Sequence, residues 1–254
     1  MANYYHLYTN NPTAGAQDGT IVSENRLMTS PISVMLDALK NESKAIKCAI
    51  RCESGFETAG DVLIQPRYYN GSETVTAGGN IDKWKVAPDL STAGKTIVKI
   101  TANGVVKDTI NIGDVALTAG TDFAIGDDIN ATAFNINGAI NLKSKLYTAT
   151  VDGATITLTE NAPGAGNTPT LISITGPTGG AATLAASTQQ VVTSAAADET
   201  MMLSKGAWND SLTIKDKIDT KNYIFWVKVS ATSDEAPAKD VTTMIHTEMV
   251  VQAV

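Results

Sequence analysis

The sequence predicts a mainly β protein, in which a β-sandwich carries a small inserted α+β domain. Short segments of alternating apolar and polar residues, separated by clusters of Gly, Pro, Asn and Asp, recur along the chain, as in β-sandwiches. The composition also changes sharply in the middle, because residues 97–192 contain no Trp, Cys, Met, His or Arg. A composition switch with two edges indicates two cores in one chain. We therefore predict an outer domain formed by residues 1–95 and 198–254, and an inserted domain with its return linker at residues 96–197.

The overall composition is typical of a folded protein, with 43% hydrophobic and 18% charged residues among 254. The net charge of −7 and the absence of a Lys- or Arg-rich run oppose nucleic-acid binding, which needs clustered basic side chains. The first residues lack the pattern of a signal peptide, and no apolar run approaches the ~18 residues of a membrane span. We therefore expect a protein that is made and folded in a cytoplasm, with neither nucleic acid nor a membrane as its partner.

An aromatic cluster lies near the N-terminus, before a turn-rich segment: Tyr4, Tyr5, Leu7 and Tyr8. We interpret it as an arm that packs either on the chain's own body or on a neighbouring subunit. Tyrosine is favoured in interface cores, and chain termini become ordered when something holds them. These four residues are therefore candidate contacts with a partner, in an arm expected to be loose in the free monomer.

Residues 31–44 allow two interpretations. An apolar set at helical spacing follows a Ser-Pro start: Ile32, Met35, Leu36 and Leu39. Val34 and Leu36 instead fit the alternation of a strand. The β-like chain on both sides favours the strand by a small margin.

The rest of the outer domain is expected to contain seven strands. They are predicted at residues 45–52, 61–65, 83–87, 201–203, 211–214, 224–229 and 241–251. Pro66 is expected to end the second of them, since proline interrupts a strand ladder. The sixth, IFWVKV, is apolar on both faces around Trp226, which is typical of a central strand.

Two cysteines, Cys48 and Cys52, lie four residues apart in the first of these strands. Both point to one face, but they stand ~13 Å apart at ~3.3 Å per residue. A disulfide needs Cα atoms within ~7 Å, so we expect two free thiols that pack as small apolar residues. With no other Cys or His nearby, the pair does not form a zinc pattern.

The inserted domain is expected to follow the order β-β-β-α-β-β-β, with one helix packed on a twisted sheet. Asn103-Gly104 is typical of a type I′ turn and predicts a hairpin between residues 97–101 and 105–112. In the same way, Asp152-Gly153 predicts a second hairpin between residues 147–151 and 154–159. Further short strands are expected at residues 115–117, 122–125 and 171–174.

A helix is expected between these hairpins. Its apolar residues recur at helical spacing: Ile129, Ala133, Ile136 and Ile140. Asp127, Asp128 or Asn130 is available as its N-terminal cap. Residues 176–197 are almost wholly small and polar, and predict a linker that returns to the outer domain.

No catalytic or metal-binding pattern is present in the sequence. There is no nucleophile elbow, no H-E-x-x-H and no Walker loop. Asp127-Asp128 and Asp234-Glu235 do not supply the six or more oxygens of a calcium site, and His6 and His246 are isolated. We therefore expect neither an enzyme nor a cofactor or metal ion.

Two sets of segments carry a resemblance to known families. Residues 110–117, TDFAIGDDINATAFNINGAI and YTATVDGATITLTENAPGAGN resemble a small module that recurs in tail and decoration proteins of tailed bacteriophages. The match over the inserted domain covers about a third of the chain and keeps the order of hairpin, helix, hairpin and Gly-rich loop. The flanks AIRCESGFETAGDVLI, DKWKVAPD, KGAWNDSLTI and NYIFWVKVSATSDEAPAKD resemble an Ig-like sandwich found in phage structural proteins. The resemblance implies an Ig-like β-sandwich with an inserted module, located in a virion.

Together these observations predict a non-enzymatic structural component of a bacteriophage virion. It would decorate or join capsid or tail parts by binding copies of itself and other virion proteins. A domain inserted at a loop tip leaves the host core intact, so display at a surface is its natural use. The alternative is a virion-borne adhesin or carbohydrate-binding module that stacks a host-surface glycan on Tyr68 and Tyr69. Exposure of these two rings side by side would favour the alternative.

Overall fold

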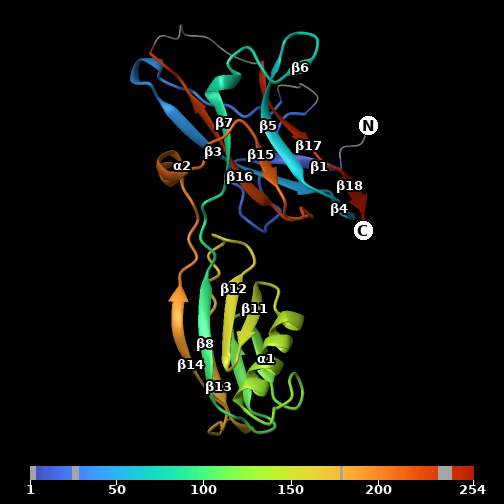
Figure 1. The fold of residues 1–254 in the computed structure, drawn as a ribbon, viewed down its shortest axis with the longest axis vertical. Coiled ribbons are helices and arrows are strands. Elements are labelled where there is room, and N and C mark those ends of the chain that lie inside the picture. The colour runs from blue at the N-terminus through green and yellow to red at the C-terminus, as the bar shows by residue number, and fades with distance from the viewer. Residues whose placement is uncertain (1–3, 25–28, 178–179, 234–241) are drawn as a thin grey trace. The chain divides into compact units, whose positions relative to one another are not determined.

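A computed structural model describes residues 4–24, 29–177, 180–233 and 242–254 (Figure 1). The chain divides into two compact units. Unit 1 comprises Met1–Leu90 and Ala197–Val254, and unit 2 comprises Ser91–Ala196. The described residues are mainly β, with 18 strands and two α-helices.

Unit 1 contains a five-stranded antiparallel sheet and a second, four-stranded sheet. The first sheet has the order β2 (Thr20–Ile21), β1 (Tyr5–Thr9), β3 (Ser43–Cys52), β16 (Tyr223–Ser230) and β7 (Trp84–Pro88). The second has the order β15 (Leu212–Ile214), β5 (Val62–Tyr69) and β17 (Thr243–Glu248), with β6 (Thr74–Val75) also paired to β5. A small separate ladder joins β4 (Phe56–Thr58) to β18 (Val251–Ala253).

The core of unit 1 lies on both faces of the five-stranded sheet. On one face, Phe225 and Val227 of β16 pack with Val62 and Ile64 of β5, so the two sheets share one apolar cluster. On the other face, Trp226 is 3% exposed and packs in a second cluster that includes Met202 of α2 (Glu199–Lys205). The prediction of a central, doubly covered strand around Trp226 is therefore confirmed.

The cysteine prediction also agrees with the structure. Cys48 and Cys52 are free, buried and on the same face of β3 as Ile50. Burial raises the pKa of both thiols, because a thiolate is poorly solvated there. Neither thiol is therefore a reactive group in the folded chain.

Two segments of unit 1 differ from their predicted structure. Residues 31–44 form neither a long helix nor a paired strand up to Glu42: Ile32, Val34 and Leu36 pack on the core as extended chain, followed by a short 3₁₀ turn, η1 (Ala38–Lys40). A 3₁₀ turn also precedes β7, at η2 (Ile81–Lys83). The strand expected at 201–203 is helix α2, because the carboxylate of Asp198 caps it by accepting a hydrogen bond from the Met201 amide.

Pro66 does not end β5, which continues to Tyr69. β15 pairs with β5 only as far as Ile64, and β6 pairs with it again at Tyr68. Between these points no described residue pairs with that edge of β5, so a proline is tolerated there. The last expected strand is instead two strands, β17 and β18, in different sheets. Asp234-Glu235 lies outside the described residues.

Unit 2 contains two sheets and one long helix. The four-stranded sheet has the order β11 (Tyr147–Asp152), β12 (Thr155–Glu160), β8 (Lys95–Ala102) and β14 (Ala185–Val192). The three-stranded sheet has the order β10 (Val115–Thr118), β9 (Thr109–Ile112) and β13 (Leu171–Thr175). Helix α1 (Ile129–Lys143) buries Ala133, Ile136 and Ile140 in a single aliphatic core with both sheets. Of the three candidate caps, Asp128 is the one that caps the helix, by accepting a hydrogen bond from the Ala131 amide.

The two predicted hairpins have opposite outcomes. β11 and β12 form the second one, with Gly153 in the left-handed region at φ 54°. The first is wrong, because β8 pairs with β12 and β14 rather than with β9. The Asn103 side chain instead donates to the Gly126 carbonyl and accepts from the Thr132 hydroxyl, so it is committed to the start of α1.

Two further expectations for unit 2 are wrong. Residues 122–125 form no strand, because Asp122 closes a tight turn by accepting from the Thr118 amide, with Gly120 at φ 82°. The supposed return linker contains β14, an eight-residue strand on the edge of the four-stranded sheet. Its small and polar residues carry no apolar alternation, so pairing with β8 rather than local pattern makes it a strand.

Candidate functional site: contact surfaces of unit 2

The N-terminal tyrosines belong to the body of unit 1. β1 pairs with β2 and β3, Tyr8 is buried, and Tyr5 and Leu7 are half-buried against the core. The expectation of a loose arm is therefore wrong. Tyr4 is 46% exposed, which makes it the most accessible of the three tyrosines, and its ring centroid lies 4.3 Å from that of Phe56. Contact with a partner through these residues stays a prediction.

Tyr68 and Tyr69 do not form one stacking platform. They are successive residues of β5, so their side chains project from opposite faces of the sheet. The Tyr68 ring lies against the backbone of Gly78 and Gly79, where an added Cβ would come within 3.1 Å and 2.4 Å of it. The Tyr69 hydroxyl donates to the Gly71 carbonyl at 2.7 Å. This geometry gives the glycan-binding alternative no support.

The titratable groups do not converge on a reaction centre in the part of the chain that the structure describes. There, no group of three or more His, Cys, Asp or Glu side chains is placed to hold a metal ion. No helix in the same residues is long and apolar enough to cross a membrane. His6 lies between Glu24 and Glu53; burial alone would lower its pKa, but hydrogen bonds to both carboxylates and their charges raise it above the ordinary value.

Unit 2 carries less charge than unit 1. Only 12 of its 106 residues are Asp, Glu, Lys or Arg, against 33 of 148 in unit 1. Residues 161–197, which include β13 and β14, contain no charged residue at all. Charged residues are depleted in the cores of protein interfaces, so a surface with few charges is suited to contact with another protein.

The first candidate contact surface is the outer face of α1, which we call the α1 stripe. It consists of four residues at helical spacing: Ala131, Phe134, Gly138 and Leu142. Asp127 and Lys145 lie just beyond the two ends of the helix. Phe134 is 66% exposed and Leu142 is 83% exposed. Phe134 and Leu142 lie eight residues apart, about two helical turns, so they project from the same side of α1 with Gly138 between them.

None of the described residues requires a glycine at position 138. A Cβ at this position would meet no atom within 4 Å, and its φ is not in the left-handed region. Glycine in a helix interior costs about 0.8–1.0 kcal/mol relative to alanine. A glycine that neither a turn nor a neighbouring side chain requires is consistent with close approach of another backbone.

Strong local contacts hold α1 in place. Lys143 forms an ion pair with Asp122, and the Ser144 hydroxyl donates to Asp114 at 2.6 Å. The side-chain amide of Asn141 bonds both backbone groups of Ala149, at 2.7 Å and 2.8 Å. It thereby satisfies part of the free edge of β11, as a neighbouring strand would. The stripe is therefore presented on a rigid element.

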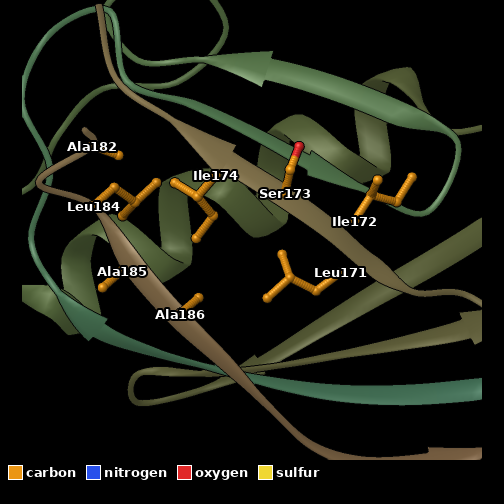
Figure 2. A pocket seen from close by; sticks show the side chains of 8 residues that line it. All are labelled: Leu171, Ile172, Ser173, Ile174, Ala182, Leu184, Ala185 and Ala186. Atoms are coloured by element: carbon orange, nitrogen blue, oxygen red, sulfur yellow. The ribbon is translucent and has the colours of Figure 1, made fainter. Parts of the chain in front are cut away.

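The second candidate contact surface is a groove of about 380 Å³ between β13 and the start of β14, drawn in Figure 2. Its lining residues are small or apolar: Leu171, Ile172, Ser173, Ile174, Ala182, Leu184, Ala185 and Ala186. Each of the two strands pairs with a neighbour on one side only among the described residues, β13 with β9 and β14 with β8. The groove therefore lies between two strand edges that the rest of the described chain leaves unpaired.

Asp108 fixes one end of this groove. It is fully buried, and its Oδ2 accepts hydrogen bonds from the amides of Val105, Thr183 and Leu184 and from the Thr183 hydroxyl. Burial alone would raise the pKa of Asp108, but these donors hold the pKa below its usual value. The carboxylate thus joins the turn before β9 to the start of β14.

Sequence reasoning did not identify either surface. The signals were present as a 37-residue uncharged tract at residues 161–197 and as an unexplained Gly138 inside a helical pattern. Their meaning depends on exposure, which a sequence pattern does not specify.

No family model, no curated protein and no solved structure matches this chain.

Proposed function

We propose that this chain is a non-enzymatic structural component of a bacteriophage virion, which decorates or joins capsid or tail parts through repeated protein–protein contacts. The resemblance of several segments to phage structural proteins is the reason for placing the chain in a virion. The observation that carries a contact role is the low charge of unit 2, together with the exposed Phe134 and Leu142 on α1.

In this proposal the outer β-sandwich is Ig-like and unit 2 is a module inserted into it. The ends of unit 2 support an insertion. The Thr92 amide donates to the Ala195 carbonyl at 2.8 Å, and the Ala195 amide donates to the Thr92 carbonyl at 3.0 Å. The chain therefore enters and leaves unit 2 at neighbouring points, as an inserted domain requires. Two sheets that enclose a shared core around Phe225 support the sandwich.

Localisation and binding to particles test the proposal. Purified particles of the phage that encodes the chain should contain it in many copies by quantitative mass spectrometry, and antibody labelling should place it at regular positions by electron microscopy. Particles made without the gene should take up added purified chain until those positions are filled. Detection of the chain only in the soluble fraction of the lysate, with no uptake by such particles, would refute it.

Variants of unit 2 add a control for the contact role. Replacing Phe134 with Ser should reduce uptake by particles, because it removes an exposed apolar group without touching the core. Leu39→Ser changes a residue of unit 1 that is 85% exposed, and should leave uptake unchanged.

A further inference from the structure

We propose that the α1 stripe binds the α1 stripe of a second copy of this chain, with the two helices antiparallel and a two-fold axis beside Gly138. The inference deepens the proposed function and rests on it, since it names one of the partners of unit 2. The occupant is a second copy because the stripe is complementary to itself in shape and in charge.

The complementarity in shape comes from the spacing of the stripe. Phe134 lies four residues before Gly138, and Leu142 lies four residues after it. When two such helices run antiparallel and cross at Gly138, Phe134 of each copy faces Leu142 of the other. The open space at Gly138 lets the two backbones approach, since no side chain stands between them. A contact of this kind is isologous and closes as a dimer.

The complementarity in charge sets the direction of the pair. Between Asp128 and Lys143 the helix has no charged residue, so two copies meet without like-charge repulsion at the centre. Asp127 and Lys145 flank the stripe at opposite ends, and both are exposed. Asp127 precedes Gly138 by 11 residues, roughly 16 Å at the helical rise of 1.5 Å per residue, and Lys145 follows it by seven, roughly 10 Å. An antiparallel pair therefore places Asp127 of one copy near Lys145 of the other, whereas a parallel pair places like charges together.

The pair is expected to be weak in isolation. Two 15-residue helices with two large apolar residues each bury less than the ~1,200 Å² of a standard stable interface. We expect a dissociation constant on the order of 100 μM for free chains. Such a contact becomes effective where many copies are held side by side, because the second contact is then intramolecular.

Sedimentation equilibrium of the full chain, from 10 μM to 1 mM, measures the pairing. The wild-type chain should show a monomer–dimer equilibrium within this range. Gly138→Gln should weaken dimerisation at least tenfold while the thermal midpoint of the monomer stays the same or rises, because the added side chain meets no atom of its own copy. Leu39→Gln is the matched control and should dimerise as the wild type does.

A charge exchange tests the direction of the pair. Asp127→Lys and Lys145→Asp should each weaken dimerisation several-fold at low salt, and the double variant should recover most of the loss. A wild-type chain that remains monomeric at 1 mM overturns the inference. So does a Gly138→Gln chain that dimerises normally, or a double variant that is no better than the single ones.

These results are separate from those that judge the proposed function. A monomeric chain that is nevertheless found in particles overturns the helix pair alone. A dimeric chain that is absent from particles overturns the proposed function alone.

Discussion

The two units of this chain reach stability through different chemistry. Unit 1 contains all three tryptophans and both cysteines, and it covers both faces of its central strand β16. Unit 2 has an almost wholly aliphatic core, completed by Phe123 and Tyr147, and ties its turns together with the buried carboxylate of Asp108. Both units expose several large apolar side chains, including Met35 and Leu39 in unit 1. Among the described residues, only unit 2 places two of them, Phe134 and Leu142, on the same side of one α-helix. The comparison shows that a low-charge segment can fold compactly and still keep an apolar surface for contacts.

The largest effect is expected from the centre of unit 1. Trp226→Ala should lower the free energy of unfolding of unit 1 by about 3–5 kcal/mol, because it leaves a large cavity and removes the hydrogen bond from the indole to Asp89. Urea unfolding followed by tryptophan fluorescence reports unit 1 alone, since unit 2 contains no tryptophan. Phe134→Ala, at an exposed site of unit 2, is the control and should cost little. A loss below about 1 kcal/mol would contradict burial of Trp226.

A smaller effect is expected from the buried carboxylate of unit 2. Asp108→Ala should lower the free energy of unfolding of unit 2 by about 2–3 kcal/mol, because three amides and one hydroxyl lose a charged acceptor. Circular dichroism should show an earlier transition, while tryptophan fluorescence of unit 1 stays unchanged. Asp152→Ala, at an exposed strand residue, should have no such effect.

The same group gives a prediction for pH. Because the folded pKa of Asp108 is lowered, its contribution is present above the unfolded value of ~3.9 and is lost as the pH falls through the lower folded value. The stability deficit of Asp108→Ala relative to wild type should therefore shrink in acid. A deficit that is equal at pH 7 and pH 2 would contradict this role.

A weaker effect of opposite sign is expected in unit 1. The folded pKa of His6 is raised, so its stabilisation is present below the unfolded value of ~6.5 and is lost as the pH rises through the folded value. The contacts of His6 with Glu24 and Glu53 are partly exposed, so their contribution to the stability of unit 1 should be about 0.5 kcal/mol or less. His246 has a lowered pKa, caused by burial and by Arg67, and acts in the other direction.

His246→Gln is therefore the background in which to measure His6. In that variant, the midpoint of unit 1 should fall between pH 6 and pH 9, and adding His6→Gln should flatten the dependence. If the slope persists without His6, another group causes it.

The smallest effect is expected from removal of unit 2. Replacing residues 92–195 with a short Gly/Ser linker should change the unfolding free energy of unit 1 by less than about 0.5 kcal/mol, because the two cut ends lie side by side. Tryptophan fluorescence in urea measures this directly. Aggregation or a lost transition would show that unit 1 depends on unit 2.

Local sequence was sufficient where an element follows from its own residues. The alternation in β3 and β16, the spacing and Asp128 cap of α1, and the tight turn at Gly153 all require only neighbours along the chain. These elements were correctly predicted because residues on one face of a strand recur every two positions, and residues on one face of a helix recur about every 3.6 positions. Burial of Trp226 and of the two cysteines followed from the same alternation.

Pairing between distant segments decided the rest. β8 pairs with β12 and β14, so Asn103-Gly104 makes no hairpin, and the small polar residues of β14 form a strand because β8 supplies their hydrogen-bond partners. The contact surfaces depend on the same long-range arrangement: α1 buries one face against both sheets and exposes the stripe around Gly138, while β13 and β14 separate and leave a groove. A local pattern specifies a backbone conformation, but hydrogen-bond partners and solvent exposure depend on residues tens of positions away, so they became visible only in the folded chain.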